Sequence, residues 1–260
     1  MEETPMLLKQ GKKDLLEYRV YASRDAMGQA AGNDIADAIV SMLKEKEELN
    51  IIFAAAPSQN ETLAALLERK DVEWNKINAF HMDEYIGLDD AAPQRFGQFL
   101  KAAIFGKVPF KSVNYINSNA ADIEAECARY TQLLTDYPVD IVILGIGENG
   151  HIAFNDPGVA DFNDPKMIKV AKLDEVCRNQ QVNDGCFAKI DDVPTHALTL
   201  TIPTLTNVKA MFCSVPAATK RWAVNETING EITDQCPATI MRKHANAILY
   251  CDNLSGADLV

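Results

Sequence analysis

The 260-residue chain lacks a long apolar run, and no stretch of it is long and apolar enough to span a bilayer. Residues 1–13 lack the apolar core of a secretory signal peptide, so we expect a cytoplasmic protein. None of the six cysteines belongs to a Cys-x-x-Cys pair, and no group of His and Cys has the spacing of a zinc site. We therefore expect reduced thiols and no bound metal.

Basic residues are in deficit. The chain has 25 Lys and Arg against 37 Asp and Glu, which gives a formal net charge of -12. This charge argues against nucleic acid or an anionic membrane as the main partner. An anionic small-molecule substrate would need a local basic pocket. The apolar fraction of 47% is ordinary for a globular protein, and the chain is long enough to bury a substantial core.

Patterns typical of strands and helices alternate along the chain. We expect strands at 19–21, 49–55, 77–82, 141–144, 197–202, 209–215 and 247–250, and helices at 24–46, 61–69, 96–105, 120–134 and 217–229. This alternation predicts an α/β fold with a mostly parallel, doubly wound (Rossmann-like) sheet and helices on both faces. There is no repeat, linker or low-complexity tract, so we expect a single domain over residues 1–260.

A glycine-rich segment, LGIGENGHIAFNDPG at 144–158, follows the apolar run 139–144. A short apolar run bounded by glycines is typical of a buried strand, and the glycines let the backbone approach a ligand. In an open α/β sheet, ligands bind outside the carboxyl ends of the strands. His151 can transfer a proton near neutral pH, and Asp156 follows within the same loop. We interpret the segment as part of an active site and not as a packed turn.

Two adjacent acids, Asp83 and Glu84, interrupt a second apolar segment at 80–88. Neighbouring strand residues point to opposite faces, so only one of the pair is expected to face a given site. A carboxylate held at a strand end can serve as a base, and partial burial tunes its pKa. Taken alone, the pair would equally fit a solvated turn after a strand.

Together the two segments resemble the glucosamine-6-phosphate deaminase (isomerase) family, which shares its fold with the 6-phosphogluconolactonases. The resemblance rests on Met-Asp-Glu-Tyr-x-Gly-Leu at 82–88 and on Gly-x-Gly-x-Asn-Gly-His-Ile-Ala-Phe-Asn at 145–155, and it extends from about Ala22 to Asp252. The lactonases usually follow Gly-His with Thr and an apolar-Phe-Pro segment. The segment IAFNDP at 152–157 is similar to the deaminase branch instead.

The resemblance implies isomerisation and deamination of glucosamine 6-phosphate to fructose 6-phosphate and ammonia. His151 would open the pyranose ring by moving a proton at the ring oxygen, with Asn149 and Asp156 orienting it. Asp83 would take the proton from C2 and return it to C1. No metal or cofactor is implied, because positioned carboxylates and a histidine suffice for the proton transfers. Glu84 is assigned to the substrate site in a supporting role, through hydrogen bonds that hold the turn.

Phosphate is expected where a strand passes into a helix N-terminus, because free N–H groups and the helix dipole favour an anion. The resemblance places a phosphate loop at 52–62, where Ser58 is the best remaining hydroxyl donor. It places a second phosphate contact at Lys220, near the start of the helix at 217–229. We also expect a homo-oligomer.

Three departures from the family concern the substrate. Residues 54–56 are alanines where glycines and Ser or Thr are usual, and alanine adopts a positive φ less readily than glycine. Gln181 stands about where the deaminases place an arginine that clamps phosphate, and Arg178 is the nearest cation that would replace it. Asp156 stands where glutamate is usual, which leaves open whether it reaches His151 directly or through a water. Asn149 stands where many members have aspartate.

Two other functions stay open. One is another sugar-phosphate enzyme on this scaffold, such as a 6-phosphogluconolactonase or an isomerase of a different sugar. The other is a non-catalytic sugar-phosphate sensor. Retention of both Asp83 and His151 argues against the sensor, whereas the altered phosphate contacts argue for it. The sequence does not determine the sugar specificity or any allosteric control.

Overall fold

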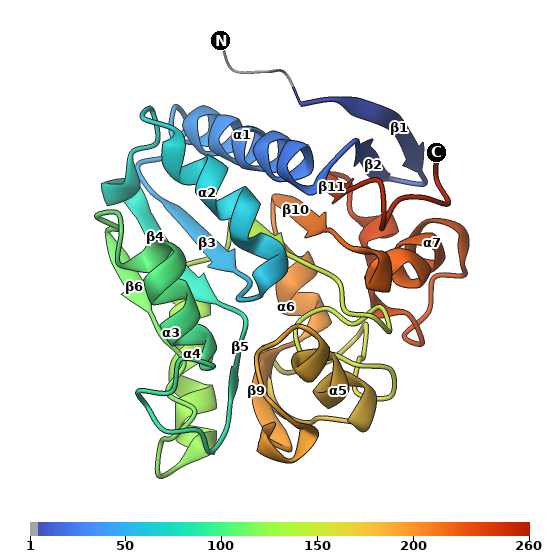
Figure 1. Cartoon of the computed structure of the whole chain (residues 1–260). Helices are drawn as coiled ribbons and strands as arrows, with labels where there is room; N and C mark the ends of the chain where they lie inside the picture. The colour runs from blue at the N-terminus through green and yellow to red at the C-terminus, as the bar shows by residue number, and fades with distance from the viewer. Residues whose placement is uncertain (1–4) are drawn as a thin grey trace.

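The computed structural model describes residues 5–260 and contains two β-sheets with helices around them (Figure 1). The strands are β1 Leu7–Lys13, β2 Leu16–Tyr21, β3 Leu49–Phe53, β4 Ile77–His81, β5 Asp83–Tyr85, β6 Ser112–Asn114, β7 Ile141–Leu144, β8 Ile168–Lys172, β9 His196–Leu200, β10 Ala210–Val215 and β11 Ala247–Cys251. The α-helices are α1 Arg24–Met42, α2 Asn60–Glu68, α3 Phe96–Leu100, α4 Ile123–Asp136, α5 Glu175–Asn183, α6 Ile202–Thr206 and α7 Arg221–Asn229. The short helices are η1 Pro57–Gln59, η2 Trp74–Lys76, the π-turn η3 Lys101–Phe105, η4 Ile190–Asp192, η5 Ala218–Lys220 and η6 Pro237–Lys243.

The larger sheet has eight strands in the order β1-β2-β11-β10-β7-β3-β4-β6. Every pair in it is parallel except the β1–β2 hairpin. This confirms the predicted α/β fold with a mostly parallel sheet. The carboxyl ends of the central strands β3, β7 and β10 lie side by side, so the loops that follow them gather at one edge of the sheet.

Helices cover both faces of this sheet, because its central strands are buried on both sides. In β3, Ile51 and Phe53 pack into the core under α1 and α2, whereas Ile52 between them packs into the core beneath α4 and α6. The two cores explain why the central strands read as continuous apolar runs in the sequence. None of the helices within residues 5–260 is long and apolar enough to cross a membrane.

The smaller sheet is antiparallel and has the order β5-β9-β8. The segment expected as a strand at 197–202 belongs to this sheet and ends at Leu200, so it is not part of the parallel sheet. The sequence analysis did not find β1, β5, β6, β8, α5 or α6. The edge strand β1 is largely exposed and lacks an apolar alternation, and β5 and β6 have only three residues each.

Helix ends differ from expectation where local capping decides them. The helix expected at 120–134 begins at Ile123, because the Asp122 side chain accepts a hydrogen bond from the N–H of Ala125. The helix expected at 24–46 ends at Met42. The segment expected as one helix at 217–229 is divided into η5 and α7, and this division shapes the site described next.

Candidate active site

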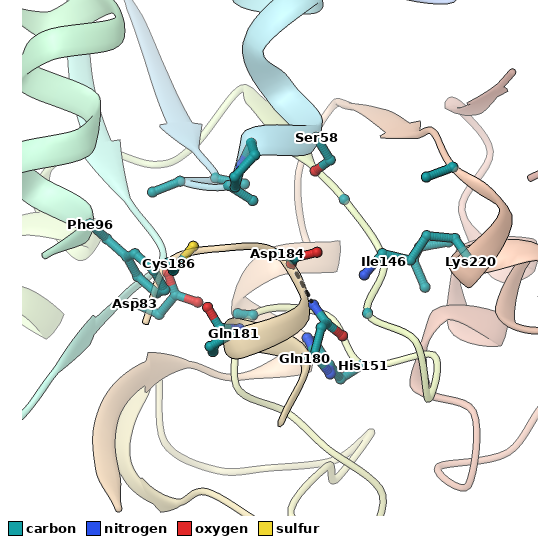
Figure 2. Close-up of a pocket in the computed structure, with 18 of the residues that line it drawn as sticks. Ser58, Asp83, Phe96, Ile146, His151, Gln180, Gln181, Asp184, Cys186 and Lys220 are labelled. Carbon is teal, nitrogen blue, oxygen red and sulfur yellow. Dashed lines mark hydrogen bonds between the residues drawn. The ribbon is translucent and has the colours of Figure 1, made fainter. Parts of the chain in front are cut away.

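A cleft of about 270 Å³ opens at the carboxyl ends of the central strands, where the two sheets meet (Figure 2). Its walls come from the loop after β3, the glycine-rich loop after β7, the turn after β10, and from β5 and α5. This is the place where open α/β sheets bind ligands. Of the predicted site residues, Ser58, Asp83, His151 and Lys220 line the cleft.

His151 is held by two neighbours from its own loop. Its Nδ1 atom lies 2.7 Å from Asn149 Oδ1 and 3.0 Å from Asp156 Oδ1. Asn149 Nδ2 donates to the same Asp156 oxygen at 2.9 Å, so the amide oxygen of Asn149 faces the ring. Asp156 therefore reaches His151 without a bridging water, which answers the question left by its shorter side chain. Because both partners of Nδ1 are acceptors, Nδ1 carries the proton and Nε2 remains an acceptor.

The glycine-rich loop allows the imidazole to fold back over its own backbone. A Cβ atom at Gly147 would lie 2.1 Å from the Cε1 atom of His151, closer than any real contact. Gly150 adopts a φ of 83°, which turns the chain between Asn149 and His151. Gly147 and Gly150 thus allow the His151 side chain to take this position.

The carboxylate of Asp156 is fully buried. Burial by itself raises its pKa, but the interaction with His151 and the hydrogen bonds from His151 and Asn149 outweigh burial and hold the pKa below its ordinary value. Asp156 therefore stays ionised and can stabilise positive charge on the imidazole. This is the arrangement expected of a histidine that transfers protons.

Asp83 lies on the other wall of the cleft, at the start of β5. Its side chain is only 6% exposed, and it has no hydrogen bond or ion pair with any residue between 5 and 260. Burial, followed by the charge of Glu84, raises the pKa of Asp83 well above its usual value. A poorly solvated carboxylate without a partner is a strong base once it is ionised.

Glu84 points away from the cleft and does not line it. Its carboxylate accepts hydrogen bonds from the N–H groups of Tyr85 at 3.0 Å, Phe96 at 3.0 Å and Gly97 at 2.9 Å. The contacts of Glu84 therefore give no support to a role as substrate ligand and agree with the expected support of the turn. The physical reason is the strand alternation between Asp83 and Glu84.

Lys220 lies at the opposite end of the cleft from Asp83 (Figure 2). It is 5% exposed, and within residues 5–260 its ammonium group has no hydrogen bond or ion pair. Burial lowers the pKa of Lys220, while the carboxylates of Asp184 and Glu148 raise it. A buried ammonium group without a counter-ion in a cleft is suited to bind an anion.

The loop after β3 does not need the glycines that its alanines replace. Ala56 is extended, with φ at -155°, and none of residues 54–56 has a positive φ. Ser58 lines the cleft, and its hydroxyl accepts a weak hydrogen bond from Gln59 at 3.2 Å. Arg24 also lines the cleft and donates to the carbonyl of Pro57 at 2.6 Å. This second cation was missed, because it lies at the start of a helix far away in the sequence.

One face of α5 forms a further wall of the cleft. Cys177 is buried beside Asp156, and Gln180, Gln181 and Asp184 line the cavity. These positions are spaced i, i+3, i+4 and i+7, as expected for one helix face. Gln181 accepts a hydrogen bond from the hydroxyl of Tyr85 at 2.8 Å. The spacing could have identified this polar face in the sequence.

Arg178 does not replace the expected phosphate clamp. It follows Cys177 by one residue, which turns it about 100° around the helix axis and away from the cleft face. Its guanidinium group donates to the carbonyl oxygens of Ile190 at 2.7 Å and Val193 at 2.9 Å, and it does not line the cleft. Arg178 thus holds the loop after α5, and its contacts give no support to the predicted role as a substrate ligand.

One group of side chains in the described part of the chain has the atom types of a metal site. The donor atoms of His151, Asp156 and Cys177 lie within 4.8 Å of one another. However, Nδ1 of His151 is already bonded to Asn149, and burial raises the pKa of the Cys177 thiol far above its ordinary value. The arrangement fits a hydrogen-bonded cluster better than an ion-binding site.

A base, a histidine–carboxylate pair and a buried ammonium group around one cleft define an enzyme that moves protons on an anionic small molecule. Residues 22–250 match the family model of the glucosamine-6-phosphate isomerases/6-phosphogluconolactonase, and the chain belongs to this family. A glucosamine-6-phosphate deaminase of Listeria welshimeri is 36% identical over 206 residues, which cover 79% of this chain and 86% of the relative. A glucosamine-6-phosphate deaminase of Streptococcus sanguinis is 33% identical over 226 residues, or 86% of this chain and 93% of the relative.

Solved structures agree with this placement. A monomeric glucosamine-6-phosphate deaminase superimposes with a TM-score of 0.83 at 30% identity, covering 94% of this chain and 99% of that structure. The 6-phosphogluconolactonase of Trypanosoma brucei has a TM-score of 0.75 at 17% identity, covering 97% and 100%. The lactonase therefore shares the fold, and the chain is a glucosamine-6-phosphate deaminase-like enzyme.

Backbone strain at Ala217 gives a first test of the site. Ala217 adopts φ 83° and ψ 147°, close to a region that is essentially restricted to glycine, and its N–H donates to Asp252 at 3.0 Å. Ala217→Gly should remove strain of about 1–3 kcal/mol and lose about 0.5–1 kcal/mol through the more flexible unfolded chain. We expect a higher free energy of unfolding in urea.

The neighbouring substitution Ala218→Gly is the matched control, because Ala218 does not have a positive φ. It should lower the free energy of unfolding by about 0.5–1 kcal/mol. Equal losses in both variants would show that Ala217 is unstrained.

Proposed function

We propose that the chain converts glucosamine 6-phosphate and water to fructose 6-phosphate and ammonia. The observation that carries the proposal is the carboxylate of Asp83 facing the same cleft as the His151–Asp156 pair, with the ammonium of Lys220 at its other end; neither group is paired with any of residues 5–260. The cleft thus carries its two proton-transfer groups and an anion contact on different parts of its lining. Residues that follow strands of the larger sheet and residues of β5 in the smaller sheet line this one cleft.

Ring opening and isomerisation both need proton transfers that these residues can supply. With Nδ1 protonated, His151 Nε2 can accept the anomeric hydroxyl proton, and the resulting imidazolium can return a proton to the ring oxygen. Asp83 then removes the proton from C2 of the open aldose, and O1 takes a proton from the substrate's own ammonium group, which gives an enolamine. The same carboxyl returns the C2 proton to C1, which leaves an imine at C2. Water adds at C2 of the resulting imine, and ammonia leaves.

Ser58 and Lys220 are proposed as phosphate ligands, with Arg24 as a second cation beside the loop after β3. Neither Gln180 nor Gln181 carries a charge, so the α5 wall offers amide hydrogen bonds where a cation would bind phosphate more strongly. A homo-oligomer and a cytoplasmic location remain proposals. The six cysteines form no disulfide within residues 5–260.

Replacing the base separates catalysis from stability. Asp83→Asn should lower kcat by about 10²–10⁴-fold in an ammonia-release assay, because an amide cannot accept the C2 proton. The raised pKa of Asp83 means that the folded state binds this proton more tightly than the unfolded state. The free energy of unfolding therefore falls as the pH rises from the ordinary pKa of Asp83 to its higher pKa in the folded protein. Above that higher pKa the free energy of unfolding stays lower.

Asp83→Asn should accordingly raise the free energy of unfolding at pH 7 and have little effect below pH 4. Glu124→Gln, at an exposed position of α4, is the control for loss of one negative charge. Deaminase activity of Asp83→Asn within threefold of wild type would exclude Asp83 as the base.

Replacing the histidine tests ring opening. His151→Gln retains a polar group of similar reach but cannot titrate, so kcat should fall with little change in KM. The pH profile of kcat should also lose one limb. Stopped-flow or steady-state rates across pH measure both effects, and an unchanged profile with wild-type kcat would make His151 a structural residue.

Removing the buried cation tests the phosphate end. Lys220→Ala should weaken binding of glucosamine 6-phosphate by about 10- to 150-fold, the equivalent of about 1.5–3 kcal/mol for a charge-assisted contact. Binding of unphosphorylated glucosamine should change little. Lys101→Ala removes an exposed lysine outside the cleft and serves as control. Equal weakening of both sugars by Lys220→Ala would exclude a phosphate contact.

A further inference from the structure

A buried amide side chain, that of Gln59, contacts the proposed phosphate ligand Ser58. Gln59 is fully buried at the junction of η1 and α2, and it does not line the cleft itself. Its Nε2 atom lies 3.2 Å from Ser58 Oγ and 3.2 Å from the carbonyl oxygen of Ser214, near the end of β10. The amide therefore links the loop after β3 to the neighbouring strand β10.

The contact with Ser214 determines how the amide is oriented. A backbone carbonyl oxygen only accepts hydrogen bonds, so the Gln59 atom beside it has to be the nitrogen. The two N–H bonds of this nitrogen then have one acceptor each, the carbonyl oxygen of Ser214 and Oγ of Ser58. Ser58 Oγ is consequently an acceptor in this contact, and the hydrogen of its own hydroxyl is not used there.

The hydroxyl hydrogen of Ser58 is thereby available to a ligand. Ser58 lines the cleft (Figure 2), and its O–H donates to no acceptor within residues 5–260. An acceptor at the position of Gln59 Nε2 would instead draw this hydrogen away from the cleft. With an N–H donor there, the hydroxyl can donate to an anionic oxygen, and the hydrogen bond that it accepts makes it a better donor.

The surroundings of Gln59 hold this arrangement. The hydroxyl groups of Thr62 in α2 and Ser214 lie 2.8 Å apart, which ties the end of β10 to α2. A Cβ atom at Gly145 would lie 3.0 Å from Gln59 Nε2 and 3.4 Å from Ser58 Oγ, so the glycine leaves room for the contact. Gln59 Oε1 is buried and has no hydrogen-bond partner within residues 5–260, which is costly. The contribution of the amide therefore comes from its N–H donors.

We propose that Gln59 is a positioning residue that orients the Ser58 hydroxyl to donate to the phosphate of the substrate. This inference deepens the proposed function and rests on its assignment of Ser58 as a phosphate ligand. It explains how a loop of alanines with one hydroxyl in the cleft presents a donor to an anion.

A double-mutant cycle tests whether Gln59 acts through Ser58. The probe is glucitol 6-phosphate, which has no carbonyl group and therefore cannot undergo ring opening or isomerisation, and calorimetry gives its dissociation constant. Gln59→Met retains a similar volume without N–H donors, and it should weaken binding by about 2- to 12-fold, as expected for one hydrogen bond of ordinary strength. In the Ser58→Ala background the same substitution should change the dissociation constant by less than about twofold.

The cycle separates positioning from packing, because a merely structural role of Gln59 would weaken binding by the same factor in both backgrounds. Equal weakening in the two backgrounds, or none in either, would overturn the proposal, and so would a wild-type chain that does not bind glucitol 6-phosphate. Gln132→Met, at an exposed position of α4 outside the cleft, is the matched control and should leave the dissociation constant unchanged. If Gln59→Met does not fold, Gln59→Glu replaces it in both backgrounds, because it retains the shape of the side chain without the N–H donors.

Binding and turnover distinguish the failure of this inference from the failure of the proposed function. Coupling between Gln59 and Ser58 in a chain that releases no ammonia from glucosamine 6-phosphate would retain the positioning role and reject the deaminase reaction. Ammonia release without this coupling would overturn the positioning role and leave the deaminase reaction standing.

Discussion

The position of Asp83, the proposed base, depends on the hydrogen bonds that the neighbouring Glu84 accepts. Glu84 receives three backbone N–H groups, one from its own strand and two from the first turn of α3. Those two N–H groups have no partner inside α3, and the helix dipole favours a negative charge there. Charge-assisted bonds of this kind are each worth about 1.5–3 kcal/mol. Because strand residues alternate, fixing Glu84 on one side of β5 directs Asp83 to the other, into the cleft.

The hydrogen bonds to Glu84 hold the carboxylate of Asp83 in a buried position that is unfavourable for its charged form. Burial without partners raises the pKa of Asp83 and destabilises its charged form. The adjacent Glu84 adds a like charge, although its own N–H partners and Arg95, 3.7 Å away, offset part of that charge. The small antiparallel sheet contributes further, since β5 is held along its length by β9. The hydrogen bonds to Glu84 therefore stabilise the strand conformation that holds the Asp83 carboxylate in the cleft.

The parts of the site that the sequence predicted are those carried by contiguous residues. The loop from Gly145 to Asp156 contains its own histidine, amide and carboxylate, and its glycines mark the required turns, so the chain order alone indicates the cluster. The central strands were equally readable, because burial on both faces gives them continuous apolar runs. The features that the sequence predicted are thus those formed by residues close together in the chain.

The parts that were missed arise from contacts between distant segments. Arg24 reaches the cleft from the first turn of α1 because that turn lies beside the carbonyl of Pro57. The face of α5 is polar, so it carries no apolar periodicity, and only its spacing of 3 and 4 residues indicates a helix wall. The exposed strand β1 and the three-residue strands owe their structure to pairing with neighbours. Propensity does not encode such pairing strongly.

The charge balance of the cleft follows from the same geometry. A chain of net charge -12 repels an anionic substrate at long range, so attraction has to come from cations held close to it. Lys220 is buried, which removes the screening that a surface lysine would suffer, and Asp184 and Glu148 counter the loss of its proton. The glutamines of α5 line the cleft without adding charge. In the proposed function, recognition of the anion therefore depends on the ammonium group of Lys220, on the loop after β3 and on Arg24.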